Sequence, residues 1–282
     1  MTKKIYKFVK LLIPPIFILV IKKTISVFRL GDFFAKHNLR WSKIIGGELV
    51  GREIFLDPDG PWRGMISGNY DNFLFNYLKQ FDLKGKTIYD IGAHIGFSSL
   101  VFANMVGGEG TVIAFEPNVY NRDRFEMILT KNEDLKKIIQ INHSAVSDHD
   151  GEEDFVFTDN VDGGTSSGSF LGNADTFWEK DIYEKNIGFK RTKVKTVTLD
   201  NLMAGGSFPI PAVIKMDIEG AEYLAVAGGL ESIKKNQIKL LIEIHSIFNM
   251  FKVAESLASI DYKLELLQEE KDGRCFMAAT PF

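Results

Sequence analysis

The stretch Thr87-Ile88-Tyr89-Asp90-Ile91-Gly92-Ala93-His94-Ile95-Gly96 decides the fold of this chain. An apolar run stops at a carboxylate, turns through two glycines and continues into a helical pattern, which predicts a buried strand, a turn and a helix. Glycine lets the backbone approach a ligand closely, and the next helix directs free N–H groups toward it. The turn therefore predicts a site for a nucleotide-like cofactor, with a helix-capping turn as the alternative. The candidate contacts are Asp90, Gly92, Ala93, His94 and Gly96.

The spacing of the glycines distinguishes between nucleotide-like cofactors. A dinucleotide fingerprint has the form G-x-G-x-x-G, and its middle glycine would fall at His94. An imidazole at that position would obstruct the close approach of a pyrophosphate. The spacing therefore favours a cofactor that has no pyrophosphate.

Strand-like apolar runs alternate with helical segments on both sides of this turn. Strands are expected at 86–91, 111–116, 138–146, 212–217, 238–244, 262–267 and 274–279, and helices at 69–81, 97–106, 119–131, 221–235 and 248–259. This alternation predicts an α/β fold with a mostly parallel sheet and helices on both faces. The last two strands are joined through a short polar turn, so the last strand should be antiparallel. Residues 159–192 show no period and are expected to form a lid, a binding loop or a disordered segment.

Composition sets the class of protein. A chain of 282 residues with 45% hydrophobic side chains can bury one large core, and a net charge of −3 is not the basic signature of a nucleic-acid-binding domain. The single cysteine, Cys275, excludes an internal disulfide and fits a reducing compartment, so a cytoplasmic location is expected.

Residues 1–40 form a basic, apolar leader ahead of a domain that we expect at 41–282. The apolar stretch 8–21 lies between lysine clusters and is interrupted by Pro14-Pro15. It is shorter than the about 20 residues that a spanning helix needs. Residues 1–30 are therefore expected to contact an anionic membrane surface, or alternatively to pack on the domain or on a partner subunit.

Five predicted strands end in polar clusters. These are Asp90-Ile91-Gly92, Glu116-Pro117-Asn118, Ser147-Asp148, Asp217-Ile218-Glu219-Gly220 and Glu243-Ile244-His245. In an open parallel sheet, ligands bind outside the carboxyl ends of the strands. The five clusters are therefore expected to share one rim and to form one site.

Two of these clusters fit the nucleoside part of a cofactor. Glu116 follows the glycine turn by roughly 20–25 residues, where a carboxylate can reach ribose hydroxyls. With Pro117 behind it, Glu116 could instead cap the next helix. Asp148, after Ser147, could accept a hydrogen bond from an adenine amino group, although turn chemistry alone would also explain this pair.

The last two clusters carry candidates for acid–base chemistry. Asp217 and Glu219 point to the same side of an extended chain, where they could share a cation, position a hydroxyl or transfer a proton. Glu243 and His245 are spaced in the same way, and histidine is the usual general base near neutral pH. The alternatives are a solvated strand end for the acids and a structural role for the histidine.

The histidines do not indicate a metal centre. His94, His143 and His149 do not have the spacing of metal ligands, so no metal is assigned. Any metal would be a hard cation held by carboxylates.

Taken together, five motifs resemble the FkbM family of S-adenosylmethionine-dependent methyltransferases. They are Tyr89–Gly96, Phe115-Glu116-Pro117, Ala145–Asp148, Val197-Thr198-Leu199-Asp200 and Ile214-Lys215-Met216-Asp217-Ile218-Glu219-Gly220-Ala221-Glu222. The resemblance covers about residues 70–246, and its most specific part is Lys-x-Asp-x-Glu-Gly-Ala-Glu. The family usually has Asn where this chain has His94.

The resemblance implies a seven-stranded Rossmann-like fold, S-adenosylmethionine as cofactor, and O-methyl transfer to a sugar, glycan or glycolipid-type acceptor, which could be lipid-linked. Asp217 is assigned to both cofactor and acceptor, and Glu219, Glu243 and His245 face the acceptor. His245 is the first choice of general base and Asp217 the second. One alternative is an NAD-dependent sugar-nucleotide oxidoreductase, but this chain lacks the glycine spacing that such an enzyme needs. The other is a non-catalytic cofactor-binding protein, which would have no need of the acidic clusters. The acceptor, any metal requirement and the oligomeric state remain open at this level.

Overall fold

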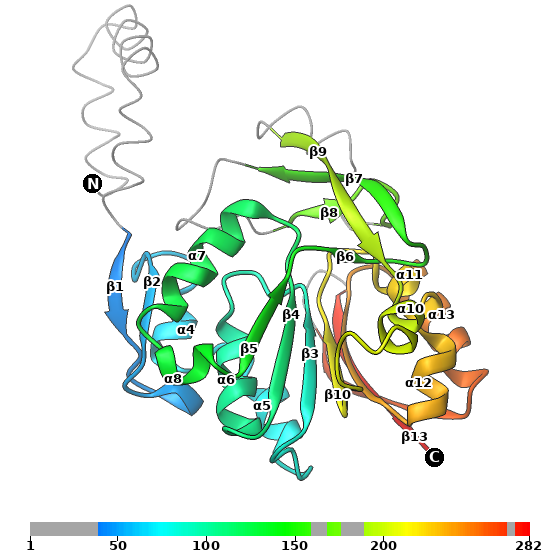
Figure 1. Ribbon diagram of the computed structural model, residues 1–282, viewed down its shortest axis with the longest axis horizontal. Coiled ribbons are helices and arrows are strands. Elements are labelled where there is room, and N and C mark those ends of the chain that lie inside the picture. Colours follow the sequence, from blue (N-terminus) through cyan, green and yellow to red (C-terminus); the bar gives the residue numbers. More distant parts are fainter. Residues whose placement is uncertain (1–38, 159–167, 176–188, 270–273) are drawn as a thin grey trace, which may run out of the picture.

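The computed structural model describes residues 39–158, 168–175, 189–269 and 274–282 (Figure 1). Nearly all of the leader at 1–40 and most of the stretch at 159–192 lie outside the described residues. The expectations for membrane contact and for a lid therefore stay predictions.

A seven-stranded sheet forms the centre of the domain, in the order β12-β13-β11-β10-β3-β4-β5 (Figure 1). The strands are β3 (Thr87–Ile91), β4 (Thr111–Phe115), β5 (Ile139–Asn142), β10 (Val213–Met216), β11 (Lys239–Ile244), β12 (Tyr262–Glu269) and β13 (Cys275–Pro281). All neighbours are parallel except that β13 runs antiparallel to both β11 and β12. The predicted α/β fold with an antiparallel last strand is confirmed.

The order of the strands locates a binding crevice. From β3 the chain adds β4 and β5 on one side, and then crosses to β10 and β11 on the other side. In open α/β sheets, ligands bind at such a reversal, outside the carboxyl ends of the strands. A binding site is therefore expected at the carboxyl ends of β3 and β10.

Helices cover both faces of this sheet because each central strand is apolar on both sides. Ile88 packs into one core with helices α5 (Asn72–Leu78), α6 (Phe97–Val106), α7 (Val119–Leu129) and α8 (Glu133–Lys136). Its neighbour Tyr89 packs into a second core with α10 (Leu199–Ala204), α11 (Glu222–Ala227), α12 (Leu230–Asn236) and α13 (Ile247–Ala258). This alternation follows from the two-residue period of a strand.

Two predicted elements are each divided in the structure. The helix expected at 221–235 becomes α11 and α12, because the chain passes through Gly228 and Gly229. A Cβ on Gly228 would collide with the carbonyl oxygen of Ser147, so the close packing there requires glycine. The strand expected at 138–146 ends at Asn142, whose side chain accepts a hydrogen bond from Ser144 N at 2.9 Å. This side-chain turn takes the backbone out of the central sheet.

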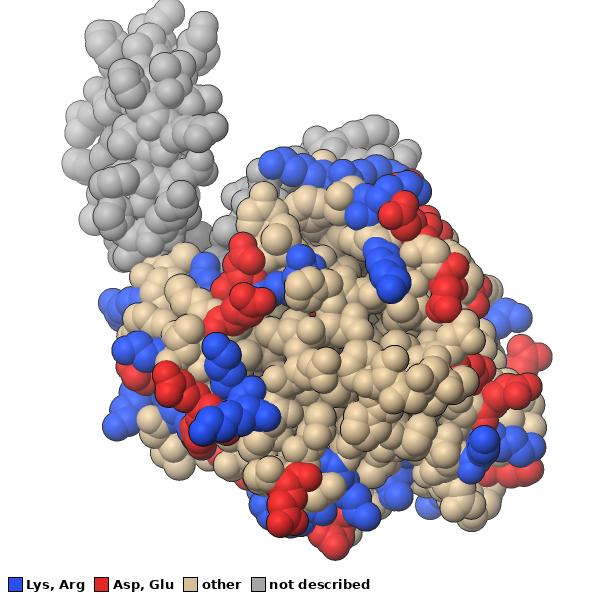
Figure 2. Space-filling model, in the orientation of Figure 1, with Lys and Arg blue, Asp and Glu red and all other residues tan. Residues whose placement is uncertain are grey.

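A second sheet, in the order β6-β9-β7-β8, lies above the carboxyl ends of the central strands (Figure 1). It contains β6 (Ala145–Val146), β7 (Gly151–Thr158), β8 (Phe170–Leu171) and β9 (Phe189–Val197). Within the stretch 159–192, expected to be a lid, a binding loop or a disordered segment, residues 170–171 and 189–192 are in strands. Figure 2 shows Lys and Arg side chains gathered at this end of the molecule, where β9 exposes Lys190, Arg191, Lys193 and Lys195.

The segment before the central sheet forms a small cap. Strands β1 (Arg40–Lys43) and β2 (Glu53–Leu56) make a hairpin around the short helix η1 (Gly47–Leu49), and α4 (Arg63–Ser67) follows. Ile54 and Leu56 are buried in the first core, as their alternation predicts. The cap brings Trp62 and Tyr70 to the edge of the cleft described next.

Candidate active site

A cleft of about 900 Å³, counted with its open mouth, lies at the carboxyl ends of β3, β4 and β10. The residues that line it come from the cap, from the strand ends and from the second sheet. They are Trp62, Met65, Tyr70, Ile91, Gly92, Ala93, His94, Phe97, Ser98, Phe115, Glu116, Pro117, Asn121, Ser144, Ala145, Val146, Phe155, Gly168, Ser169, Phe170, Leu171, Lys215, Asp217, Ile218, Glu219 and Ala221.

The turn after β3 has the conformation that its glycines predict, but the glycines are required for packing within the protein. Gly92 and Gly96 have φ of 80° and 85°, which favour glycine. A Cβ on Gly92 would collide with the carbonyl oxygen of Asp217, and one on Gly96 with the ring of Phe125. Both glycines therefore permit close packing within the protein, whereas we expected them to permit close approach of a ligand. Gly92 lines the cleft, and Gly96 does not.

Asp90 is also placed differently from the prediction. It is fully buried and lies below the cleft lining. Its carboxylate accepts a hydrogen bond from Ser99 Oγ and lies 3.5 Å from Lys215 Nζ. Asp90 therefore supports the turn from beneath, and the expected direct contact with a cofactor is not available to it.

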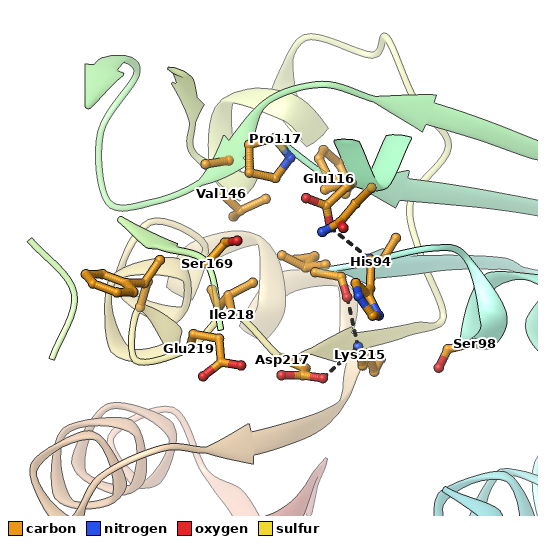
Figure 3. Close-up of a pocket in the computed structure, with 18 of the residues that line it drawn as sticks. His94, Ser98, Glu116, Pro117, Val146, Ser169, Lys215, Asp217, Ile218 and Glu219 are labelled. Carbon is orange, nitrogen blue, oxygen red and sulfur yellow. Dashed lines mark hydrogen bonds and ion pairs between the residues drawn. The ribbon is translucent and has the colours of Figure 1, made fainter. Parts of the chain in front are cut away.

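Lys215 joins the two strand ends that form the cleft floor, a role that the sequence analysis missed. Its ammonium donates to the carbonyl oxygen of Gly92 at 3.2 Å and to Asp217 Oδ2 at 3.5 Å (Figure 3). Burial opposes its charge, but the carboxylates of Asp217 and Asp90 outweigh that effect and raise the pKa of Lys215 above its ordinary value. The feature of the sequence that could have indicated this role is the position of Lys215 inside the most specific motif, Lys-x-Asp-x-Glu-Gly-Ala-Glu.

Glu116 lines the cleft and is fixed by two backbone donors. Its Oε2 accepts from His94 N at 2.8 Å (Figure 3). Its Oε1 accepts from Asn118 N, also at 2.8 Å. Burial raises the pKa of Glu116 to about 7, against the effect of these hydrogen bonds. The carboxylate is thus held beside Pro117 at the end of β4, where the sequence analysis expected a contact with ribose hydroxyls.

The third predicted cluster does not reach the cleft. Ser147 is buried, and its hydroxyl donates to Asp148, whose carboxylate accepts from the ring of His149 at 2.8 Å. Because the chain turns out of the central sheet at Asn142, the cleft is lined instead by three residues that come slightly earlier. These are Ser144, Ala145 and Val146.

Aromatic rings form a wall that the sequence analysis did not predict. The ring of His94 lies 5.0 Å from that of Trp62, centroid to centroid, and Tyr70 contacts both Trp62 and Phe97 edge-on. Burial lowers the pKa of His94 to about 4, so this imidazole is neutral. His94 Nε2 has no hydrogen-bond partner among the described residues. The feature of the sequence that could have indicated this wall is the pair Trp62 and Tyr70 in the glycine-containing segment 60–70.

The floor of the cleft is acidic. Asp217 and Glu219 line it, with about a quarter of each side chain exposed. Glu219 has φ of 54°, a left-handed conformation that is uncommon for a residue with a Cβ. Such conformations are retained where the surroundings enforce them, often at functional sites. Here the conformation turns the Glu219 carboxylate to within 3.5 Å of His245.

Glu243 and His245 lie directly beneath these two acids. His245 is 1% exposed, and its Nε2 lies 3.7 Å from both Asp217 Oδ1 and Glu243 Oε1. The structure therefore brings the four predicted acid–base residues together, with Asp217 and Glu219 facing the cleft and the other two buried. Arg274 pairs with Glu243 at 3.0 Å.

Two groups in this cluster have strongly shifted pKa values. Burial opposes the charge on His245, but Glu222 and Glu219 outweigh that effect and raise its pKa well above the ordinary value. Burial, with Asp217 next, raises the pKa of Glu243 to about 9. Near neutral pH both groups therefore hold a proton.

Residues 90–270 match the family model described as the methyltransferase FkbM domain. The chain belongs to this family. A methyltransferase family is what the motifs around the cleft predicted.

Similar proteins carry related names. A hexuronic acid methyltransferase, AglP, from Haloferax volcanii is 25% identical over 187 residues, which cover 66% of this chain and 66% of that protein. The methyltransferase FkbM from Methylobacillus flagellatus KT has a solved structure with a TM-score of 0.49 and 19% identity, covering 69% of this chain and 43% of that one. An S-adenosylmethionine-dependent O-methyltransferase from Thermotoga maritima has a TM-score of 0.44 and 13% identity, covering 74% and 63%.

Proposed function

We propose that this methyltransferase uses S-adenosylmethionine and methylates a hydroxyl group of a sugar or glycan. The observation that carries the proposal is the placement of carboxylates at both ends of the cleft. One end holds the fixed carboxylate of Glu116, and the other holds the exposed carboxylates of Asp217 and Glu219. A nucleoside with hydroxyl groups suits the first end, and a hydroxyl acceptor suits the second.

The residues of the cleft fit this cofactor. Glu116 can accept hydrogen bonds from ribose hydroxyls, and Pro117 and Val146 offer apolar surface to a base. The backbone of Gly92 and Ala93 lines the part of the cleft between the two carboxylate ends. The buried Nε2 of His94, without a partner among the described residues, can accept a hydrogen bond from the ligand.

The chain's task in the reaction is to place the acceptor and receive its proton. When bound, S-adenosylmethionine supplies a methyl group on a positively charged sulfur, which keeps the bonding electron pair as the acceptor oxygen attacks the methyl carbon. Asp217 orients the hydroxyl and takes its proton as the new C–O bond forms. Correct placement of the reacting atoms can itself lower the barrier by several kcal/mol.

Asp217 is better placed than His245 for this role, so we reverse the order that the sequence suggested. Burial opposes its charge, but Lys215 and His245 outweigh that effect and lower the pKa of Asp217, which is ionised near neutral pH. His245 holds a proton and lies behind the cleft lining. His245 is therefore a positioning residue that orients Asp217.

The proposed acceptor class rests on the site and on the named relative. Carboxylates that face a cleft accept hydrogen bonds from sugar hydroxyls, and the similar AglP is named for a hexuronic acid. The test is calorimetric titration with S-adenosylmethionine and with NAD, followed by a methyl-transfer assay on neutral sugars, uronic acids and lipid-linked glycans. We expect binding of S-adenosylmethionine alone, and transfer to a sugar hydroxyl. Binding of NAD, or transfer to nitrogen, would overturn the proposal.

A membrane-associated acceptor is part of the same proposal, and its support is the sequence of the leader. The apolar stretch 8–21 is flanked by lysines, which favours contact with anionic lipid. Among the residues that the structure describes, no helix is long and apolar enough to cross a bilayer. Full-length protein should sediment with anionic vesicles at low salt and much less with neutral vesicles. Equal recovery with both vesicle types would contradict the proposed contact.

A further inference from the structure

We propose that Asp217, Glu243 and His245 bind a divalent cation at the floor of the cleft. From the sequence no metal is assigned, because His94, His143 and His149 lack the spacing of metal ligands, and the carboxylates are expected to hold at most a hard cation. The role given below to the cation in methyl transfer rests on the proposed function. Its binding to these three residues does not.

The three side chains converge with the spacing that metal ligands need. One ligand atom from each lies within 4.8 Å of the other two. His245 Nε2 is 3.7 Å from Asp217 Oδ1 and 3.7 Å from Glu243 Oε1. A cation that binds its ligands at about 2.1 Å holds neighbouring ligand atoms roughly 3 to 3.5 Å apart. A small inward movement of each side chain would therefore complete the coordination.

A buried nitrogen without a partner points into this space. His245 Nε2 is inaccessible to solvent and makes no hydrogen bond within the described part of the chain. Its nearest acidic oxygens, on Asp217, Glu219 and Glu243, are all 3.5 Å away or more. A buried polar atom left unsatisfied is costly, and a cation that binds here would displace the Nε2 proton and use the lone pair of that nitrogen.

The other ring nitrogen of His245 is held as in metal-binding histidines. A carboxylate can only accept, so Nδ1 donates to Glu222 Oε1, at 2.9 Å. The same Glu222 oxygen accepts from Ile218 N and Gly220 N, which fixes its position. A ligating histidine typically donates its other N–H to a carboxylate, which directs the free lone pair of its second nitrogen at the metal.

The charges around His245 also favour a cation. Four carboxylates surround the ring, from Asp217, Glu219, Glu222 and Glu243. In the described part of the chain, the cations that contact this set are Lys215 on Asp217 and Arg274 on Glu243, besides His245 itself.

The ligand types indicate the kind of ion. Two carboxylates suit Mg²⁺, Ca²⁺ and Mn²⁺, whereas an imidazole suits the transition metals. The mixed set therefore favours a divalent transition ion such as Mn²⁺. Asp217 borders the cleft, so the ion would have an open position toward the acceptor. There it would hold the acceptor hydroxyl and lower its pKa, as metals do for bound water, and the hydroxyl proton would pass to the oxygen of Asp217 that does not bind the ion.

Titration of Mn²⁺ into the EDTA-treated full-length protein tests the site, with the EPR signal of free Mn²⁺ as the readout. We expect one saturable site per chain. Binding should weaken about tenfold or more in Asp217→Asn, Glu243→Gln and His245→Gln. The matched controls His149→Gln and Glu231→Gln change a histidine and a glutamate that lie outside the cluster, and should bind Mn²⁺ as the wild type does. Thermal unfolding identifies any variant that fails to fold, and Asp217→Asn, at the partly exposed position, is the variant most certain to remain folded.

The outcomes separate this proposal from the proposed function. If the folded wild-type protein shows no saturable Mn²⁺ binding, or if Asp217→Asn binds Mn²⁺ as tightly as the wild type, the cation site is overturned. Titration of S-adenosylmethionine in EDTA is the independent test of the cofactor. Mn²⁺ binding without cofactor binding would support the cation site and reject the proposed function. Cofactor binding without Mn²⁺ binding would support the proposed cofactor and reject the cation site.

Discussion

His245 and Glu222 form a buried pair beneath the active-site cleft, with His245 Nδ1 2.9 Å from Glu222 Oε1. Neither side chain lines the cleft. The pair fixes which nitrogen of His245 faces the acids above it. Because Asp217 and Glu219 are held from below in this way, the geometry of the floor depends on residues that do not contact the substrate.

Replacing Glu222 by glutamine should lower the pKa of His245. Glu222 is the carboxylate that contributes most to keeping the imidazole protonated, against the opposing effect of burial. Glutamine retains an oxygen acceptor of the same size and removes the charge. The measurement is an NMR titration of the His245 ring in ¹⁵N-histidine-labelled protein without added metal, in wild type and Glu222→Gln.

The same variant should also be less stable. Removing one partner of a buried ion pair typically costs about 3–5 kcal/mol, and denaturant unfolding should show a loss of that order. An unchanged His245 titration in a folded Glu222→Gln protein would contradict the assignment. Glu231→Gln, in the exposed first turn of α12, is the control for loss of a carboxylate.

The variant Asp217→Asn should retain cofactor binding and lose turnover. Asparagine has nearly the same shape as aspartate, but it cannot take a proton from the acceptor hydroxyl. Loss of a general base typically lowers the rate by about 10²- to 10⁴-fold. We expect kcat to fall by this order, while the Kd for S-adenosylmethionine changes by less than about tenfold. A near-normal kcat would remove Asp217 from its proposed role.

Adding a methyl group at Gly96 should destabilise the fold through Phe125. Gly96 has φ of 85°, and a Cβ there would collide with the Phe125 ring, which is fully buried. The strained backbone costs about 1–2 kcal/mol, and overpacking adds about 1–3 kcal/mol. Urea denaturation of Gly96→Ala should show a loss of about 2–5 kcal/mol.

A second substitution tests the cause of that loss. Phe125→Leu should destabilise the wild type, because it leaves a cavity, and should recover part of the loss in the Gly96→Ala background. We expect a coupling energy of about 1 kcal/mol or more between the two positions in a double-mutant cycle. Additive effects would show that the ring of Phe125 is not what excludes a side chain at position 96.

The central sheet was predictable because its strands carry their own signal. The strands β3, β4, β10 and β11 are nearly continuous apolar runs, as expected for parallel strands that are covered on both faces. A polar residue lies within one position of the end of each strand, which also gave the position of the site; these residues are Asp90, Glu116, Asp217 and His245. The acidic floor was also expected, but not its geometry, because β10 ends at Met216 and Glu219 has a left-handed backbone instead of the extended one.

The second sheet and the aromatic wall could not be predicted in this way. Strand β9 exposes most of its first half and carries several lysines, and β7 begins with Glu152, Glu153 and Asp154. Their pairing depends on contacts far apart in the sequence, such as Glu152 with Lys195. Likewise Trp62 reaches the cleft only because the cap folds against the turn that carries His94.

The variant His94→Asn should make the protein more resistant to acid. Burial lowers the pKa of His94 to about 4, against an ordinary value of 6.5 and despite the opposing charge of Asp217, with Lys215 and Arg124 lowering it further. Between pH 6.5 and 4 the unfolded chain therefore binds a proton that the folded protein does not, and the free energy of unfolding falls as the pH falls. The full effect is at most about 3.4 kcal/mol, for a pKa that falls from 6.5 to about 4 at 1.36 kcal/mol per pKa unit.

Asparagine removes this titration and tolerates the left-handed backbone at position 94, where φ is 54°. Urea unfolding at pH 7.5 and pH 4.5 measures the effect. Asparagine forfeits the packing of the imidazole on Trp62, so the variant should be slightly less stable than the wild type at pH 7.5. It should lose less stability than the wild type on going to pH 4.5. Equal losses in both proteins would show that His94 does not take up a proton on unfolding in this range.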